Sequence, residues 1–170
     1  MTVTTLQVGK HSAHSGEVCL LEAVSVLAGE DFSDTPETAC PVLASFGRAL
    51  NDAMPDDETR GLLLPLIPLL VGTRDPAKER TRAFYLADRS IRLYAPAIDV
   101  MPPTEIVDTE WVAEPAAWTA WTSASEATAW AATATAAEVA AWAARAATAT
   151  AAEVAAWALI VQIFTEAIAL

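Results

Sequence analysis

The sequence is poor in the side chains that perform catalysis near neutral pH. Histidine and cysteine each occur twice among 170 residues, so the chain has little capacity for general-base chemistry. It contains no glycine-rich phosphate loop, no Ser-His-Asp arrangement and no HExxH motif. Enzymatic activity would have to depend on carboxylates alone. The sequence therefore favours a non-enzymatic protein and predicts no cofactor.

Positive charge is also scarce. The chain has 10 Lys and Arg against 22 Asp and Glu, a formal net charge of −12, which repels phosphate backbones and anionic lipids. Residues 1–60 hold 10 acids and 3 bases, residues 101–170 hold 8 acids and 1 base, and residues 61–100 hold 4 acids and 6 bases. We expect no nucleic-acid or membrane partner, and we interpret the basic part, 74–92, as an internal docking surface for the acidic parts.

Long hydrophobic runs and cysteine-rich blocks are missing. The longest apolar runs, 62–72 and 154–164, are about half as long as a membrane-spanning helix. The first fifteen residues contain no apolar stretch of the kind that a secretory signal needs. Two cysteines, Cys19 and Cys40, are too few for a disulfide scaffold. We therefore expect a cytoplasmic protein with reduced, buried thiols.

What the sequence does contain is a series of helix signals. The apolar-rich run 17–27 is closed by Gly29, a natural residue at a helix C-terminus. The segment 34–37 (Asp-Thr-Pro-Glu) has the spacing of a capping box. Together with Pro41 in a first turn, it predicts a helix from about 39 to 53. These features indicate two helices separated by an acidic loop.

Proline and acidic residues mark two further helix starts. The segment 55–58 (Pro-Asp-Asp-Glu) places acids at the positive end of a helix dipole, but Pro65 and Pro68 then predict a kink or break. The segment 75–76 (Asp-Pro) opens another run with apolar residues at helical spacing. No stretch shows sustained alternation of period two. The predicted fold is all-α, a compact bundle of about four helices followed by a long Ala/Trp-rich helix or helical hairpin.

An internal repeat distinguishes the C-terminal part. The segment TATAAEVAAWA occurs at 133–143 and again at 148–158, and a Glu-x3-Trp unit begins at residues 114, 126, 138 and 153. Alanine favours helix, and neither Gly nor Pro occurs in 116–170. Steps of 12 and 15 residues rotate successive Trp side chains by roughly 120° or 60°. A heptad coiled coil is therefore excluded, while one long helix and a hairpin both stay open.

These features divide the chain into three parts. Residues 1–15 are predicted to be a flexible N-terminus, 16–100 a helical domain, and 101–170 an Ala/Thr/Trp-rich helical repeat segment. An exposed Ala/Trp surface would be a large apolar patch, so we expect the domain, another subunit or a foreign protein to cover it. The candidate interaction residues are Trp118, Trp121, Trp130, Trp142, Trp157 and Arg145.

The leading hypothesis is a non-enzymatic interaction or assembly module that acts through this repeat. Self-association and intramolecular docking of the repeat are its expected modes. A remote alternative is ice or surface binding by the Thr/Ala repeat, which requires threonines on one flat face. The threonines at 133 and 135 and at 148 and 150 do not recur with a clean helical period.

A small-molecule or metal-binding helical domain is the main alternative. The side chains with zinc-binding atoms are His11, His14, Cys19 and Cys40, and their spacing fits no common zinc framework. Cys19 and Glu22 share a helical face, but a carboxylate raises the pKa of a neighbouring thiol and opposes a thiolate nucleophile. We predict no metal site. The weak candidates are His14, Cys19, Glu22, Cys40 and the acidic loop 30–37.

Short blocks between residues 14 and 74 form a recognisable pattern. They are CLLEAV at 19–24, AGE at 28–30, SD at 33–34, PV at 41–42, ND at 51–52, PD at 55–56 and the stretch 63–73. Together with the Ala/Trp-rich composition of the C-terminal tail, these blocks resemble uncharacterised helical proteins of actinobacteria and their phages that end in Ala/Trp-rich repeats. The resemblance implies a helical fold, and it implies no particular activity. Tails of that family often carry Arg and Asp where this chain has Thr.

Overall fold

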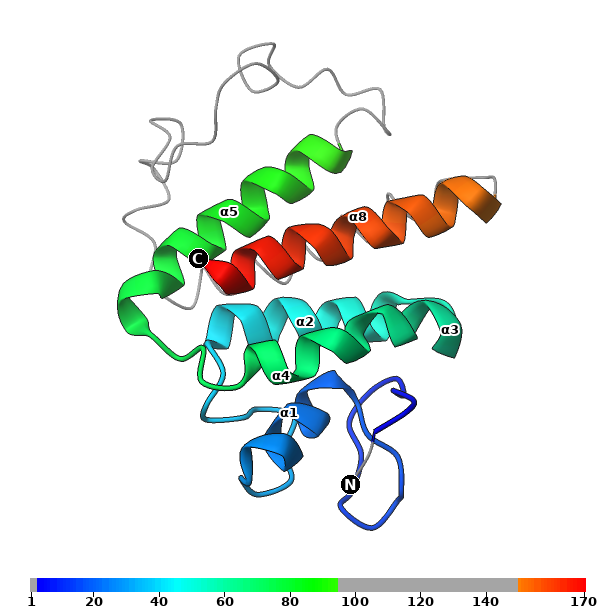
Figure 1. The fold of residues 1–170 in the computed structure, drawn as a ribbon, viewed down its shortest axis with the longest axis vertical. Helices are drawn as coiled ribbons and strands as arrows, with labels where there is room; N and C mark the ends of the chain where they lie inside the picture. The colour runs from blue at the N-terminus through cyan, green and yellow to red at the C-terminus, as the bar shows by residue number, and fades with distance from the viewer. Residues whose placement is uncertain (1–2, 95–149) are drawn as a thin grey trace.

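The computed structural model describes residues 3–94 and 150–170, and the regular secondary structure in these residues is helical (Figure 1). No strand occurs in these residues, so the predicted all-α class is confirmed. None of the helices described is both long enough and apolar enough to cross a membrane. With the labels of Figure 1, the elements are α1 (Leu20–Ala28), α2 (Pro41–Ala53), α3 (Asp57–Arg60), the 3₁₀ helix η1 (Gly61–Leu66), α4 (Ile67–Leu70), α5 (Pro76–Tyr94) and α8 (Thr150–Ala169).

Helix α1 ends where the sequence predicts and begins three residues later. Gly29 adopts a left-handed backbone with φ 75°, which glycine tolerates without strain. At the other end Cys19 is extended and serves as the N-cap residue. The preceding residue, Val18, accepts a backbone hydrogen bond from Gln7 at 2.9 Å. The chain before Cys19 therefore pairs with the N-terminal segment instead of continuing the helix.

Helix α2 begins at Pro41 as expected, but the predicted capping box before it does not form. Asp34 accepts a hydrogen bond from the Lys10 ammonium at 2.8 Å and lies 3.7 Å from the Arg48 guanidinium. The residue that precedes the helix is Cys40. The prediction from the 34–37 spacing was wrong because distant basic side chains take the Asp34 carboxylate away from the local backbone.

Proline divides the next stretch into short pieces, as the sequence predicts. Asp56 caps α3 by accepting a hydrogen bond from the Thr59 amide at 2.7 Å, as P-D-D-E segments favour. Pro65 lies inside η1, and Pro68 in the first turn of α4. The last N-terminal helix, α5, begins at Pro76, the residue that the Asp-Pro pair indicates.

The C-terminal helix α8 covers one side of the bundle. It contacts α2, α5 and η1, and it runs antiparallel to α5 (Figure 1). We call the faces of α2, α5 and η1 that contact it the α8 seat. Helix α1 packs against α2 and α4 on the other side of the bundle. The largest fully buried side chains come from both parts of the chain and include Leu6, Leu20, Leu43, Phe46, Leu86, Trp157 and Phe164.

Within residues 1–15, which the sequence predicts to be flexible, the segment contacts the bundle at Leu6, Gly9 and His11. Leu6 is fully buried in the core, and the Gly9 amide donates to the Asp52 carboxylate at 2.8 Å. The segment is rich in Ser and His, which are typical of exposed loops. A single leucine and long-range polar contacts give it a fixed position.

Candidate functional site

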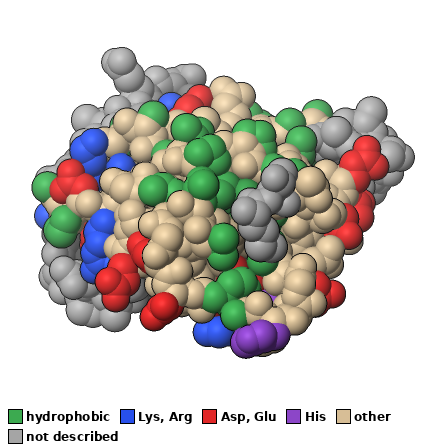
Figure 2. Space-filling model, turned by 60° about the horizontal axis from the view of Figure 1, so that its bottom comes forward, with side chains coloured by type: hydrophobic (Ala, Val, Ile, Leu, Met, Phe, Trp, Pro, Cys, Tyr) green, Lys and Arg blue, Asp and Glu red, His purple; other side chains and the backbone are tan. Residues whose placement is uncertain are grey.

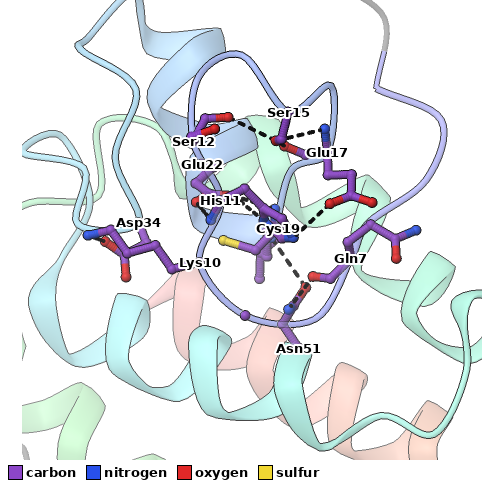
Figure 3. Close-up of polar contacts among 12 residues, drawn as sticks. Gln7, Lys10, His11, Ser12, Ser15, Glu17, Cys19, Glu22, Asp34 and Asn51 are labelled. Carbon is purple, nitrogen blue, oxygen red and sulfur yellow. Dashed lines mark hydrogen bonds and ion pairs between the residues drawn. The ribbon is translucent and has the colours of Figure 1, made fainter.

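A buried carboxylate lies at the centre of the main polar cluster. Glu22 is 0% exposed and accepts three hydrogen bonds (Figure 3). The His11 amide lies 2.6 Å from Oε1, the His11 ring Nδ1 lies 2.8 Å from Oε2, and the Cys19 amide also lies 2.8 Å from Oε2. The contact with Cys19 caps the first turn of α1. The contacts with His11 fasten the N-terminal loop to that same turn.

Hydrogen bonding determines the charge state of Glu22. Burial alone would raise the pKa of its carboxyl group, but hydrogen bonds from Cys19 and His11 outweigh the burial and hold the pKa below its usual value. Both carboxylate oxygens are occupied by donors within the protein. Glu22 is therefore an ionised structural anchor, and its complete burial keeps a substrate from reaching the carboxylate.

Asn51 connects the cluster to α2. Its amide oxygen accepts from the Leu20 N–H at 3.2 Å, and its amide nitrogen donates to the Gln7 carbonyl at 2.9 Å and to Asp52 at 3.0 Å. The side chain is fully buried. One residue of α2 thus satisfies a free N–H at the start of α1 and a carbonyl of the N-terminal segment, groups that would be costly to leave unpaired.

The Cys19 thiol beside this cluster has low reactivity. Cys19 is 2% exposed. Burial is the largest cause that raises its pKa to about 11, and the Glu22 charge adds to it. The sequence anticipates the effect of the carboxylate but not the larger effect of burial. At neutral pH the group is a protonated thiol, which is a poor nucleophile.

The structure brings together only two of the four weak metal candidates. Cys19 and Glu22 are neighbours, but the histidine that joins them is His11, while His14 is exposed. Cys40 lies at the start of α2, eleven residues or about 16 Å along the helix from Asn51, which contacts the Leu20 amide next to Cys19. Within residues 3–94 and 150–170 no three His, Cys, Asp or Glu side chains are placed to hold a metal ion.

The acidic loop 30–37 binds its own backbone and a lysine. The Glu30 carboxylate accepts from the amides of Glu37 at 2.6 Å and Thr38 at 2.7 Å. The hydrogen bond from Lys10 is the main reason that the pKa of Asp34 is lowered. These acids close the loop between α1 and α2, so they serve the fold, as helix caps and solvated acids commonly do.

The second candidate region is the α8 seat. Trp157 and Phe164 are 0% exposed, and the Phe164 ring lies 5.2 Å from the Phe46 ring, centroid to centroid. A Cβ atom on Gly47 would lie 2.9 Å from the Phe164 ring, so glycine allows α8 to approach α2 closely. The indole nitrogen of Trp157 is buried and has no hydrogen-bond partner among the residues that the structure describes. Shape and apolar burial therefore hold this residue.

Polar contacts fix the direction of α8 along α5. The Arg82 guanidinium donates to the Thr73 carbonyl at 2.6 Å and to the Ile168 carbonyl at 3.4 Å, and the Tyr85 hydroxyl donates to Glu166. Burial, followed by the hydrogen bond to Glu166, raises the pKa of Tyr85. Within the described residues, the basic part of the chain thus meets an acidic side chain of the C-terminal part.

Apolar side chains also remain on the surface. Figure 2 shows green hydrophobic side chains gathered across the middle of one face, with charged side chains mostly toward its edges. Among the residues described, the large hydrophobic side chains more than one third exposed are Val8, Leu27, Leu62, Leu69 and Leu159. They come from several elements and lie outside the buried face of α8.

Sequence reasoning singled out Trp157 of α8, considered His11 only as a zinc ligand, and missed Asn51 of the polar cluster. Trp157 is a predicted interaction residue, and it is buried by the bundle. His11 and Asn51 carry no local signal, because their partners lie 11 and 31 residues away. The other predicted interaction residues, Trp118, Trp121, Trp130, Trp142 and Arg145, lie outside the described residues, as does the choice between one long helix and a hairpin. Comparison with protein-family models, curated proteins and solved structures gave no match.

Proposed function

We propose that the chain is a non-enzymatic interaction or assembly module that acts through its Ala/Trp helical repeat. The observation that carries this proposal is the environment of Trp157, the Trp of the last Glu-x3-Trp unit. This residue lies on a helix and is fully buried against the bundle. A repeat unit in helical form can thus use its Trp as an anchor, the residue type that most often dominates helix and protein interfaces.

The preceding unit has the same eleven residues but a different continuation. Fifteen residues before Ile160 and Phe164, which are both fully buried in the α8 seat, the sequence has Arg145 and Ala149. A charged and a small side chain cannot replace these two apolar anchors. The upstream Trp residues are therefore left to contact a helix of another chain, and the small Ala residues around them permit close approach.

The chemistry of the polar cluster supports a role without catalysis. Glu22 is ionised and fully hydrogen-bonded, and the Cys19 thiol is protonated at neutral pH. Together these groups lack a free base and an activated nucleophile. Their contacts hold the N-terminal segment on the bundle, which supports the surface that carries α8.

We also propose the setting of this module. Its charge of −12 argues against nucleic acid and anionic membranes, and buried free thiols at Cys19 and Cys40 suit the reducing cytoplasm. The sequence blocks between residues 14 and 74 support kinship with the helical proteins of actinobacteria and their phages. That kinship indicates the kind of organism in which the module acts. The repeat indicates the kind of partner that it contacts.

Light scattering of the full chain tests the proposal. We expect concentration-dependent oligomers, and a variant with Trp118, Trp121, Trp130 and Trp142 changed to Ala should form smaller oligomers than the parent. The matched control is Trp157→Phe, which keeps an aromatic anchor and should leave the oligomers intact. A monodisperse monomer for the intact protein at every concentration would remove self-association. Oligomers of unchanged size in the fourfold variant would show that the upstream Trp residues are not the contact.

A further inference from the structure

The connection between α5 and α8 is much longer than their packing requires. Arg82 contacts Ile168 and Tyr85 contacts Glu166, so the two helices are adjacent and antiparallel (Figure 1). Adjacent antiparallel helices are usually joined by 2–8 residues. Here 55 residues, 95–149, separate them in the sequence. The covalent connection therefore does not oblige α8 to dock on the bundle of its own chain.

The contacts in the α8 seat are the same whichever chain supplies the helix. Trp157, Ile160 and Phe164 are fully buried, and Phe164 fills the space that Gly47 leaves on α2. The bond from Tyr85 to Glu166 and the bond from Arg82 to Ile168 determine the direction of the helix. None of these contacts depends on residues 95–149. Exchange between identical chains would keep every one of these contacts. It competes with docking inside one chain, so it increases as the chain concentration approaches the effective concentration that the connection sets.

We infer that α8 exchanges between copies of this chain, so that the α8 of one copy occupies the seat of a second copy. This inference rests on the proposed function in that it makes a second copy the partner. It uses a different surface, since the contacts come from residues 157–168 and not from the upstream Trp residues. In a dimer that has exchanged its α8 helices, the repeat segments of both copies would belong to the same assembly.

Complementation between two full-length variants tests the exchange. In Gly47→Leu the added side chain meets the Phe164 ring of α8 and also Leu20 of α1, so the seat is blocked while the sequence of α8 stays intact. In Trp157→Ala/Phe164→Ala the seat stays intact, while α8 lacks its anchors. We expect the mixture to form a hetero-complex in native mass spectrometry that neither variant forms alone, with a higher melting temperature than either. The matched control is Gly61→Leu, because no atom lies within 4 Å of a Cβ at Gly61.

Cross-linking provides a second test that leaves the apolar anchors unchanged. Tyr85→Cys is placed in one copy and Glu166→Cys in another, since these two side chains meet across α5 and α8. Tyr85 and Glu166 meet at the tips of long side chains, so cysteines at these positions are too far apart for a direct disulfide. A bis-maleimide reagent therefore joins the two thiols, and we expect a cross-link between copies in the mixture. The native thiols, Cys19 and Cys40, are buried. The parent chain, treated in the same way, measures the background cross-linking that they cause.

The outcomes separate the exchange from the proposed function. Failure of both mixtures overturns the exchange if the variants are folded and if a single chain with both Tyr85→Cys and Glu166→Cys cross-links internally. Oligomers of the intact chain that disappear in the fourfold Trp variant would then leave the proposed function standing. Conversely, a cross-link between copies that persists in the fourfold Trp variant supports the exchange alone.

Discussion

Glu22 shows how one buried carboxylate joins two segments of the chain. Its two oxygens receive backbone and side-chain hydrogen bonds from His11 and a backbone hydrogen bond from Cys19. Hydrogen bonds to a charged group contribute about 1.5–3 kcal/mol each, and a donor left unpaired costs a similar amount. The stability of the N-terminal segment therefore depends strongly on the ionised form of this one side chain.

We expect the stabilisation from Glu22 to fall in acid. Because the folded pKa is below the ordinary value of 4.5, the contribution is fully present above that value and is lost as pH falls through the folded pKa. Glu22→Gln should lower the free energy of unfolding in urea by about 2 kcal/mol near neutral pH. The difference from the parent should shrink below about pH 4.

The control for this pH effect is Glu17→Gln. The Glu17 side chain is 60% exposed and lies 3.9 Å from His11 Nε2, so its loss should cost well under about 1 kcal/mol. An equal loss of stability for Glu22→Gln at neutral and acid pH would contradict the assigned role, since it would mean that the charge of Glu22 does not matter.

At this scale the sequence predicts the pair of Cys19 and Glu22, three positions apart, but not their surroundings. The pair is local, and the spacing from N-cap to N3 in a capping box brings it together, although Cys19 is extended and not on a helical face as expected. His11 and Asn51 enter from other elements, and their positions depend on how the whole bundle packs. An asparagine in the last turn of a helix has no sequence mark that distinguishes a buried linker from a solvated side chain.

Helix α8 is an element whose stability comes from its buried anchors. Trp157→Ala should lower the free energy of unfolding by about 3–5 kcal/mol, the usual cost of removing a large aromatic side chain from a core. Trp157→Phe should cost much less, because the indole nitrogen makes no hydrogen bond that would be lost. Urea unfolding followed by circular dichroism measures both values.

A matched control lies on the exposed side of the same helix. Leu159 is 42% exposed, so Leu159→Ala should change stability by no more than about 0.5–1 kcal/mol. Equal losses for Leu159→Ala and Trp157→Ala would mean that helix content, and not the seat, determines the stability of α8.

Element boundaries were predictable where the cause is local. The left-handed Gly29, the break at Pro65 and the start of α5 at Pro76 all follow from backbone properties of one or two residues. The start of α1 and the absent capping box at 34–37 depend on partners far along the chain, Gln7 and Lys10. Local spacing contains no information about those partners.

Across the whole molecule, burial of both cysteines provides a probe of global opening. Cys19 is 2% exposed, with a pKa of about 11, and Cys40 is 0% exposed. We expect neither thiol to react with a disulfide reagent at mildly alkaline pH in the native protein. Both should react at once in guanidinium chloride. A thiol that reacts rapidly in the native state would contradict the packing around α1 or the start of α2.

The N-terminal and C-terminal parts of the chain differ in the kind of hydrophobic residue that they contain. Bulky side chains such as Phe46 and Leu86 fill the core of the N-terminal bundle, whereas much of the hydrophobic fraction of the C-terminal part is alanine. The class of fold was predictable because Gly, Pro and acidic residues mark the helices one by one. The position of α8 was not, since it depends on a fit between Gly47 and Phe164, residues 117 positions apart in the sequence.

The late position of Phe164 has a consequence for synthesis of the chain. At about 5–20 residues per second, the ribosome needs roughly 3–11 s to make the 55 residues between α5 and α8. During that interval the helices of residues 3–94 can fold, but the pocket beside Gly47 is still empty. The nascent bundle therefore displays an apolar surface while its own cover is unmade. Any α8 that covers this surface during the interval has to come from another molecule.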